Sequence, residues 1–396
     1  MSAAELFLIE NLLWELAERQ LAIPTVGYDP SSFPRALISW LANKPREIIV
    51  VTVSSEKQKA RTLLNSEPIR AANTGTEILL LSIPLPNKRD QIVHGIQACT
   101  GRIVGLVDDD AFWNPHTLIH LLAPFQEPDI GLVGGPIESY IPDERKDSSV
   151  ITAWEVAALR NRSKRRGGNK LFYARDGSTN FTVSGATMLL RAAVVKDPVF
   201  QTEFTDEKFL GVRMNTGDDS FITRFILFQH LSEGRQGGRK WRLGMQITPE
   251  ATVTTSLIPD SRFADQMKRW LRTGLRFRLI CLFREPGLRN FWRTTPYMCK
   301  KMAEGLYNPF LNIIWYVCFF KVVHQRPLLA SLIMLYYLYG LVISILAFAR
   351  EFPYARRHIW AAFIIDRVSL ISDFYCWSTL AQESWTSRKG VDGIDM

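Results

Sequence analysis

The sequence predicts an α/β fold, a parallel sheet covered by helices and followed by helices that meet a membrane. Apolar runs of strand length alternate with amphipathic stretches through the first part of the chain. One such run, 103–107, continues directly into three carboxylates at 108–110. Near the other end, residues 328–349 carry no charge, and this run is long enough to cross a hydrocarbon core of about 30 Å.

The first segment, 1–20, is expected to form an amphipathic helix, because Leu6, Ile9, Leu13 and Leu16 recur between glutamates. It is too polar for a signal peptide or a membrane span. The elements that follow alternate, which favours parallel strands. Strands are expected at 21–25, 47–53, 77–83, 103–107 and 130–135, and helices at 33–42, 57–65 and 88–99.

The acidic triplet follows the strand at 103–107, at the sheet edge where open α/β proteins bind ligands. Asp108 and Asp110 are two residues apart, so a turn can bring both to one hard cation that also carries substrate phosphate. Carboxylates of this kind suit Mg²⁺ or Mn²⁺. An acidic turn that caps the helix beginning near 114–115 explains the triplet equally well.

Lys88 and Arg89 open the helix that precedes the acidic strand. From this position a cation can reach a diphosphate at the sheet edge. Taken alone, the pair is more simply a solvated basic patch.

Two further turns carry candidate site residues. Ser184 and Gly185 precede the apolar run 187–190, and such a small-residue turn either lets the backbone approach a sugar closely or is an ordinary turn. Asp218 and Asp219 follow Gly217 at the start of an apolar helix. Helix capping is the simpler explanation of these two carboxylates, but they also supply the general base that a metal-assisted transfer needs.

Residues 263–284 form a basic helix in which arginines alternate with leucines, as in a helix that lies in the headgroup plane. Gln266, Arg269 and Trp270 share one face of it. They could offer a substrate a hydrogen bond, a phosphate clamp and a stacking surface.

The uncharged runs 305–320 and 328–349 are expected to form a transmembrane hairpin joined by 321–327. The arginines that follow it suit the cytoplasmic side. The segment 359–381 contains charged residues and is expected to be interfacial rather than spanning.

The composition of the chain limits the kinds of molecule that it is expected to bind. A net charge of +9 favours anionic partners, and with no basic-aromatic module in the sequence we expect nucleotide phosphates and membrane headgroups rather than nucleic acid. The five cysteines have no metal-ligand spacing, which fits a reducing, cytosol-facing site.

In this order the motifs resemble those of the processive membrane glycosyltransferases of family 2, the hyaluronan, cellulose and chitin synthases, and most closely the fungal hyaluronan-synthase-like members. The matching stretches are Lys88-Arg89, the triplet at Asp108, Ser184-Gly185, Gly217-Asp218-Asp219 and Gln266 to Trp270. The tail around Trp385 is similar to a gating loop of W-G-T-R type. This chain departs from the family in having Val51-Thr52-Val53-Ser54 where an Asp usually contacts the nucleoside, Ala186 in place of a proline, and no amino-terminal spans.

The resemblance implies a GT-A (Rossmann-like) fold and an inverting transfer from a UDP-sugar to a growing polysaccharide. Asp108 and Asp110 would hold Mn²⁺ or Mg²⁺, Lys88 and Arg269 would neutralise the diphosphate, and Arg89, Ser184, Gly185 and Gln266 would bind substrate. Asp219 would be the base beside Asp218, and Trp270 and Trp385 would contact the acceptor. A single transfer to a lipid acceptor of the ceramide or dolichol type, and a catalytically silent membrane partner, are the alternatives. The oligomeric state is left open.

These expectations divide the chain into five parts. They are an amphipathic helix (1–20), a GT-A catalytic domain on the cytosolic side (21–262), basic interfacial helices (263–301), a transmembrane hairpin (302–350), and an interfacial helix with a gating-like tail (351–396).

Overall fold

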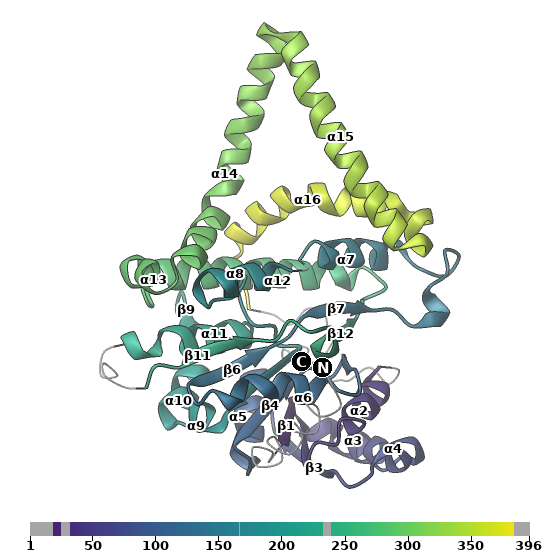
Figure 1. The fold of residues 1–396 in the computed structure, drawn as a ribbon, viewed down its shortest axis with the longest axis vertical. Helices are drawn as coiled ribbons and strands as arrows, with labels where there is room; N and C mark the ends of the chain where they lie inside the picture. The colour runs from purple at the N-terminus through teal and green to yellow at the C-terminus, as the bar shows by residue number, and fades with distance from the viewer. Residues whose placement is uncertain (1–18, 25–31, 166, 233–238, 384–396) are drawn as a thin grey trace.

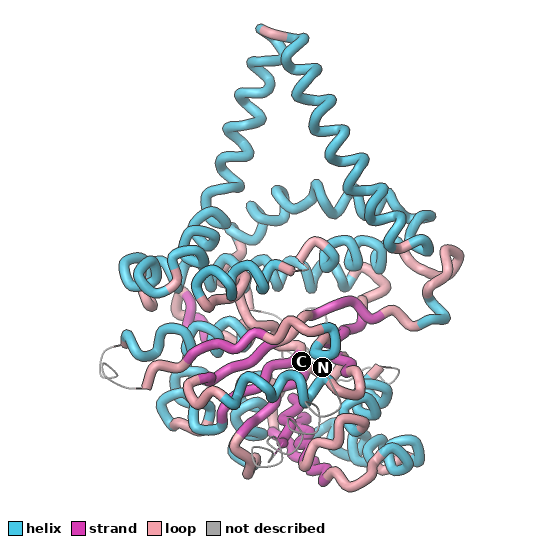
Figure 2. Tube along the Cα trace, viewed as in Figure 1, coloured by secondary structure: helices cyan, strands magenta, loops and turns pink. Residues whose placement is uncertain are grey.

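The computed structural model describes residues 19–24, 32–165, 167–232 and 239–383, and in it an α/β body lies below a set of helices that ends in a long hairpin (Figure 1, Figure 2). Most of the helix expected at 1–20 lies outside the described residues, as does Trp385. Arg19 and Gln20, which the sequence pattern assigns to the end of that helix, begin a strand instead.

The main sheet has the strand order β11-β6-β8-β4-β1-β2-β3. Its strands are β1 (Arg19–Pro24), β2 (Glu47–Val53), β3 (Glu77–Ile83), β4 (Ile103–Val107), β6 (Ile130–Gly134), β8 (Thr187–Arg191) and β11 (Arg242–Met245). The strands expected at 47–53, 77–83 and 103–107 are confirmed residue for residue. Apart from Glu47, Glu77 and Ser82, their residues are apolar, β-branched or glycine, a composition typical of parallel strands covered on both faces.

The sheet is mixed rather than parallel, because β8 runs antiparallel to both β4 and β6. The chain enters β8 at the carboxyl end of β4, where Thr187 lies opposite Val107. The Asp108 N–H donates to the carbonyl of Ala186 at 3.1 Å. The antiparallel strand therefore places the small-residue turn at 184–186 beside the acidic triplet.

Helices cover both faces of the sheet. Successive strand residues point to opposite faces, so that Ile48 and Val50 belong to one core cluster and Ile49 and Val51 to the other. The Ile48 face is covered by α2 (Phe33–Leu41), α3 (Lys57–Leu64), α4 (Glu67–Ala72) and α6 (Thr117–Leu122). The Ile49 face is covered by α5 (Lys88–Ala98), α9 (Ala192–Val195), α10 (Pro198–Asp206) and α11 (Asp218–Phe228).

Two smaller sheets extend from the body. A three-stranded sheet joins β5 (Ala111–Trp113), β12 (Val253–Ser256) and β7 (Ile137–Tyr140), and a short hairpin joins β9 (Lys208–Phe209) and β10 (Val212–Arg213). The first of these begins directly after the acidic triplet, since β5 starts at Ala111, and the Ser256 N–H of β12 donates to the carbonyl of Asp110 at 3.3 Å.

A layer of helices lies between the body and the hairpin (Figure 1). It contains α7 (Ala153–Ser163), α8 (Gly168–Asp176), α12 (Arg262–Phe283), α13 (Leu288–Thr294) and α16 (Ile359–Ser378). The expectation that the arginines of α12 face headgroups is wrong for Arg272 and Arg276, which are 5% and 2% exposed. Phe277 and Cys281 join the core of the body, and α16 packs on another side of the helix. Packing between layers therefore explains much of the amphipathic pattern of α12.

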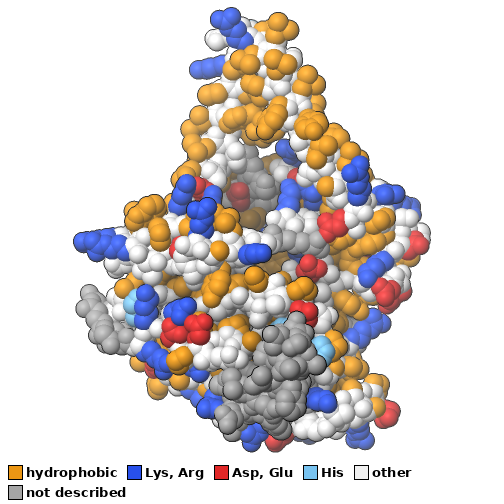
Figure 3. All heavy atoms as spheres, in the orientation of Figure 1, with side chains coloured by type: hydrophobic (Ala, Val, Ile, Leu, Met, Phe, Trp, Pro, Cys, Tyr) orange, Lys and Arg blue, Asp and Glu red, His pale blue; other side chains and the backbone are white. Residues whose placement is uncertain are grey.

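The hairpin consists of α14 (Pro296–Gln325) and α15 (Pro327–Glu351), which are both long and apolar enough to cross a membrane. Only 6% of the most apolar window of each helix is buried. Apolar side chains cover its legs, and cationic side chains gather at its tip (Figure 3). Both legs return to the same side of the hairpin, where the helical layer lies (Figure 1).

A buried ion pair fixes the base of the hairpin to the helical layer. Arg160 of α7 donates to Asp366 of α16 at 2.8 Å and to the carbonyl and hydroxyl of Ser344 in α15 at 3.2 and 2.6 Å. The side chains of Arg160 and Asp366 are 6% and 8% exposed. One guanidinium thus connects three helices that are far apart in the sequence.

Replacing Asp366 with Asn is expected to lower the free energy of unfolding by about 3–5 kcal/mol, because the change leaves the Arg160 charge buried without its counter-ion. Denaturant unfolding of the purified protein in detergent measures this loss. Asp143, whose ion pair with Lys146 is exposed, gives the matched control, and Asp143→Asn should leave the unfolding midpoint unchanged. Equal midpoints for the two variants would contradict the role given to Arg160.

Candidate active site at the carboxyl edge of the sheet

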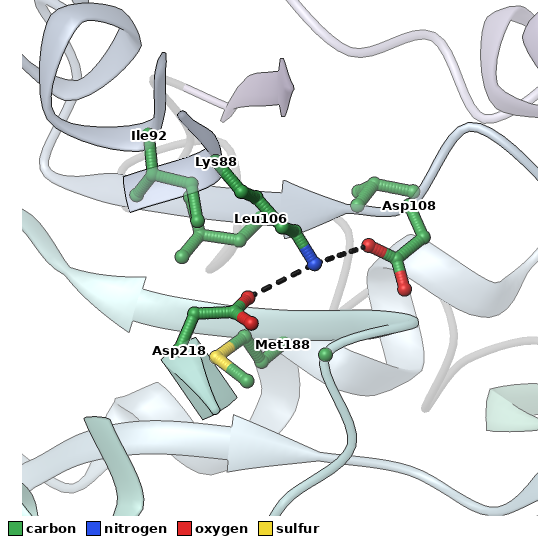
Figure 4. Close-up of a pocket in the computed structure, with 8 residues that line it drawn as sticks. Lys88, Ile92, Leu106, Asp108, Met188 and Asp218 are labelled. Atoms are coloured by element: carbon green, nitrogen blue, oxygen red, sulfur yellow. Dashed lines mark hydrogen bonds and ion pairs between the residues drawn. The ribbon is translucent and has the colours of Figure 1, made fainter. Parts of the chain in front are cut away.

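Lys88, the first residue of α5, lies at the centre of the site. Its Nζ is 2.9 Å from Asp108 Oδ1 and 3.0 Å from Asp218 Oδ2, so it bridges the end of β4 and the start of α11 (Figure 4). Asn87 caps the helix by accepting the N–H groups of Arg89 and Asp90. The Lys88 N–H donates to Asn215 Oδ1 at 3.1 Å, which ties the helix start to the turn before α11.

The pocket around Lys88 combines a charged rim with an apolar wall. Lys88, Asp108 and Asp218 supply the charges. The other residues that line it are Ile92, Leu106, Val107, Gly185 and Met188. Ionic groups against apolar walls interact more strongly than they would in water, so the protonation states of the carboxyl groups depend on this arrangement.

The two carboxyl groups that contact Lys88 shift in opposite directions. Burial raises the pKa of Asp108 above its ordinary value despite the attraction of Lys88. Burial opposes ionisation of Asp218 too, but Lys88 and then Arg89 hold its pKa below the usual range. Burial alone would lower the pKa of Lys88, and the two carboxylates raise it instead. These opposite shifts favour a charged Lys88 with Asp218 as its ionised counter-ion.

Asp219 differs from its neighbour. Burial, and then the charge of Asp218, raise the pKa of Asp219 to about 6. Its Oδ1 accepts the N–H of Ser220 at 2.7 Å, which fixes the carboxyl group at the start of α11. A carboxylate with a pKa close to neutrality is a better proton acceptor than one held at its ordinary value.

The turn at Ser184 and Gly185 lies against these acids. A Cβ built on Gly185 would be 3.4 Å from the Cβ of Asp219 and 3.7 Å from Asp218 Oδ2. Ser184 Oγ accepts the N–H of Ala186 at 3.3 Å, which stabilises the turn. The structure thus brings together five sequence-predicted residues from four separate segments, namely Lys88, Asp108, Gly185, Asp218 and Asp219.

The prediction that Arg89 binds substrate is wrong, because its side chain is fully buried. Its guanidinium donates to Glu207 Oε2 at 2.8 Å, to the carbonyl of Phe204 at 2.7 Å and to the carbonyl of Thr216 at 2.9 Å. Glu207 also accepts from Arg224 at 2.6 Å. Arg89 therefore stabilises the turn that leads to Asp218 from inside the body.

Arg162 is a site residue that sequence reasoning missed, since it stands in a basic run that resembles a solvated helix end. It contacts the hydroxyl and carbonyl of Thr255 and the carbonyl of Ser256. Burial lowers the pKa of Arg162 to about 10, while the nearby Asp110 opposes this shift. Arg162 therefore adds a cation next to the second predicted metal ligand.

Trp270 lies partly buried between two cations. The guanidinium carbons of Arg162 and Arg165 are 5.6 and 5.4 Å from the centroid of its ring. Trp270 also packs against the apolar cluster formed by α7, α16 and the base of α15. Its role as a stacking surface, and the substrate roles of Gln266 and Arg269 on the same helix, stay predictions.

The carboxylates fit a metal ion that brings its own phosphate ligands. No group of three or more His, Cys, Asp or Glu side chains is arranged to hold a metal among the residues that the structure describes. Asp108 and Asp110 are hard oxygen donors at one sheet edge, and Mg²⁺ or Mn²⁺ is commonly held by one or two carboxylates plus substrate phosphates. This donor set therefore suits a cation bound together with a nucleotide, and not a permanent structural metal.

Comparison with known proteins identifies the class. The family model described as glycosyltransferase-like family 2 matches residues 21–272. The chain is 30% identical to the NDP-glycosyltransferase ltbB of Aspergillus luteorubrus, over 93% of this chain and 88% of that one. It is 26% identical to a type 2 glycosyltransferase of Zymoseptoria tritici, over 95% and 76%. The chain therefore belongs to glycosyltransferase family 2.

A solved structure supports the fold. The mannosyltransferase PcManGT from Pyrobaculum calidifontis, in complex with GDP-Man and Mn²⁺, superposes with a TM-score of 0.51 over 91% of this chain and 95% of that one, at 14% sequence identity. The predicted GT-A fold and the predicted glycosyltransferase activity are confirmed. The narrower type, a polysaccharide synthase, stays a prediction.

Proposed function

We propose that this enzyme transfers a sugar, with inversion, from a UDP-sugar to a growing β-linked polysaccharide at a membrane. The observation that carries the proposal is the pocket in which Lys88 bridges Asp108 and Asp218 and Asp219 lies alongside with a pKa of about 6. A cation for a leaving diphosphate and a carboxylate for an acceptor hydroxyl are the two parts that a single displacement needs. The GDP-Man complex of the structurally similar mannosyltransferase is consistent with a nucleotide-sugar donor.

Each charged residue has one role in this proposal. Lys88 leaves part of its contact with the carboxylates to interact with the diphosphate, and Arg269 adds a second positive charge to it. Asp219 accepts the proton of the acceptor hydroxyl as that oxygen attacks the anomeric carbon from the face opposite the departing diphosphate. Asp218 keeps Lys88 in position, because its lowered pKa keeps it ionised.

Asp108 and Asp110 would hold Mn²⁺ or Mg²⁺ through their carboxylate oxygens. The metal would supply positive charge to the diphosphate when bound. The Mn²⁺ in the mannosyltransferase complex supports this choice of ion.

Asp110→Asn is expected to abolish the metal-dependent part of UDP binding, because a site with two protein carboxylates loses half of its charged ligands. UDP titrations with and without Mn²⁺ measure this. Asp90 forms an exposed ion pair with Arg213 and gives the control, because Asp90→Asn should keep the metal dependence. Unchanged Mn²⁺ dependence in Asp110→Asn would contradict the metal assignment.

We also propose that the hairpin crosses the membrane and that the catalytic domain faces the cytosol. The two apolar helices, their exposed legs and the cationic tip support the first part. The return of both legs to the helical layer keeps the two hairpin ends on the side of the catalytic domain, and the arginines at 350, 356 and 357 on that side support a cytosolic orientation. The proposed division of the chain into five parts, with the hairpin at 302–350 as the only membrane-spanning part proposed, rests on the same arrangement of helices.

A single transfer to a lipid acceptor is the second candidate. The name of the NDP-glycosyltransferase that is similar over 93% of this chain specifies no polymer product, which leaves room for it. A lipid acceptor would also reach a site located below a membrane hairpin. Membership of a glycosyltransferase family disfavours the third possibility, a catalytically silent partner.

Product size separates the two acceptors. Purified membranes containing the enzyme are incubated with radiolabelled UDP-sugars and Mn²⁺, and the products are separated into aqueous polymer and organic-phase glycolipid. High-molecular-weight label supports polysaccharide synthesis, and label that partitions with lipid supports single transfer. Label that is incorporated equally by Asp219→Asn membranes, or no incorporation from any UDP-sugar, would overturn the proposal.

A further inference from the structure

The segment 380–383, which follows α16, crosses the turn that leads to the catalytic acids. Glu383 Oε2 accepts the backbone N–H of Asn215 at 3.3 Å and that of Thr216 at 3.1 Å. The same oxygen is 2.9 Å from the hydroxyl of Thr216. A carboxylate far along the chain thus accepts two successive backbone N–H groups directly before Gly217 and Asp218.

Arg276 of α12 holds this segment in place. Its Nη1 forms an ion pair with Glu383, its Nε donates to the carbonyl of Leu380 at 2.8 Å, and its Nη2 donates to the carbonyl of Gln382 at 2.6 Å. The side chains of Arg276 and Glu383 are 2% and 10% exposed. Charge-assisted bonds at this depth are strong and geometrically specific.

The turn is held from the opposite side by the body. Arg89 donates to the carbonyl of Thr216, and Asn215 Oδ1 accepts the N–H of Lys88. Gly217 has a φ of 71°, a left-handed conformation that favours glycine and leaves the turn shape dependent on these anchors. The body therefore binds the carbonyl of Thr216, and the 380–383 segment binds its N–H.

We propose that Glu383 is a positioning residue for the catalytic base, and that through it the C-terminal segment sets the position of Asp219 in the pocket. Two backbone N–H bonds and the Arg276 ion pair define where the turn ends and α11 begins. Releasing the turn on this side lets the start of α11 move and gives the carboxyl group of Asp219 more solvent. The inference rests on the proposed function of Asp219 as the base.

Hydrogen exchange tests the structural part without reference to activity. In Glu383→Ala, peptides that span 214–219 should exchange at least tenfold faster than in the unchanged protein, because the N–H groups of Asn215 and Thr216 lose their acceptor. Peptides from β2 should not change, which shows that the variant is folded. Glu304→Gln, which removes a carboxylate paired with Lys301 on α14, is the charge-matched control. Unchanged exchange over 214–219 in Glu383→Ala would overturn the proposal.

Kinetics test the positioning part. Glu383→Ala should lower kcat by roughly tenfold or more, because the start of α11, which carries Asp219, is no longer held on this side. The acid limb of its pH–kcat profile should shift below pH 6, because added solvent relieves the burial that raises the pKa of Asp219. Glu383→Gln keeps the side-chain shape and one acceptor oxygen. Its kcat and its acid limb should lie between those of Glu383→Ala and those of the unchanged enzyme. A merely structural residue would reduce the amount of folded enzyme and leave the kcat per folded enzyme and the acid limb in place, and that result would overturn the proposal.

Hydrogen exchange and the pH–kcat profile together distinguish a failure of this inference from a failure of the proposed function. Faster exchange over 214–219 combined with an unshifted acid limb would show that Glu383 holds the turn but that Asp219 is not the titrating base. That result would contradict the inference through the proposed function and not through the contact itself. Faster exchange with a shifted acid limb supports both the positioning role of Glu383 and the role of Asp219 as the base.

Discussion

Replacing Asp219 with Asn should reduce the rate of sugar transfer by roughly 10² or more while the affinity for UDP stays close to that of the unchanged enzyme. Asn retains an oxygen that can accept the N–H of Ser220, so the start of α11 is preserved. It cannot accept a proton from the acceptor hydroxyl. The loss should therefore appear in kcat, and UDP titration should show that the donor site is intact.

The pH dependence of kcat provides the check on this assignment. The raised pKa of Asp219 means that its carboxyl group ionises in the folded enzyme only as the pH rises through about 6. The base is therefore lost as the pH falls below 6, and kcat should fall with it. The residual activity of Asp219→Asn should lack this limb. An acid limb that persists near pH 6 in the variant would assign the titration to another group.

Asp218→Asn makes an informative comparison, because Asp218 is adjacent to Asp219 but has a different contact. It pairs with Lys88, and its pKa is lowered rather than raised. Its replacement should weaken UDP binding as well as transfer, since Lys88 loses one of the groups that position it. Identical behaviour of the two variants would argue that both acids only cap α11.

The strands and helices that position the site were predictable because their sequence patterns depend on local burial. β2 and β4 are buried along their whole length and, apart from Glu47 and Thr52 in β2, consist of apolar residues and glycine, so the carboxyl end of β4 could be placed directly before Asp108. The basic pair at 88 and 89 and the acids at 218 and 219 stand at helix starts. These signals placed Lys88, Asp108 and Asp219 at element ends before their contacts were known.

The roles of several charged residues could not be predicted, because they depend on contacts between distant segments. Arg89 stands next to Lys88 in the sequence, yet it points into the core toward Glu207, whereas Lys88 faces the pocket. Arg276 alternates with leucines as a headgroup-facing residue would, but its partner is Glu383. A pattern of charges on one helix shows which side is polar, and does not show whether water or a buried carboxylate lies on that side.

The apolar run at 187–190 was not predicted to be a strand, and the antiparallel direction of β8 was missed with it, for a related reason. Its apolar run is short, and both parallel and antiparallel strands produce such runs when they are buried. Only the pairing of Thr187 with Val107 shows that the chain enters this strand at the catalytic edge. That direction is what places Gly185 against Asp218 and Asp219.

Replacing Lys88 with Met should lower kcat/KM for the nucleotide sugar by roughly 10²–10³, the usual effect of removing one preorganised group that stabilises developing negative charge. Met keeps the apolar stem that lies against the pocket wall and removes only the charge (Figure 4). Without the ammonium group, Asp108 and Asp218 are buried near each other with no cation between them, so the pKa of at least one of them should rise further. UDP affinity should therefore fall more at pH 8 than at pH 5.5, because a higher pH favours the ionised carboxyl groups that repel the diphosphate. Lys88→Arg should restore part of the activity, and Lys59→Met, at an exposed lysine paired with Glu56, should leave it unchanged. If Lys88→Met bound UDP as tightly as the unchanged enzyme at both pH values, Lys88 would be a counter-ion for the two aspartates and not a ligand of the diphosphate.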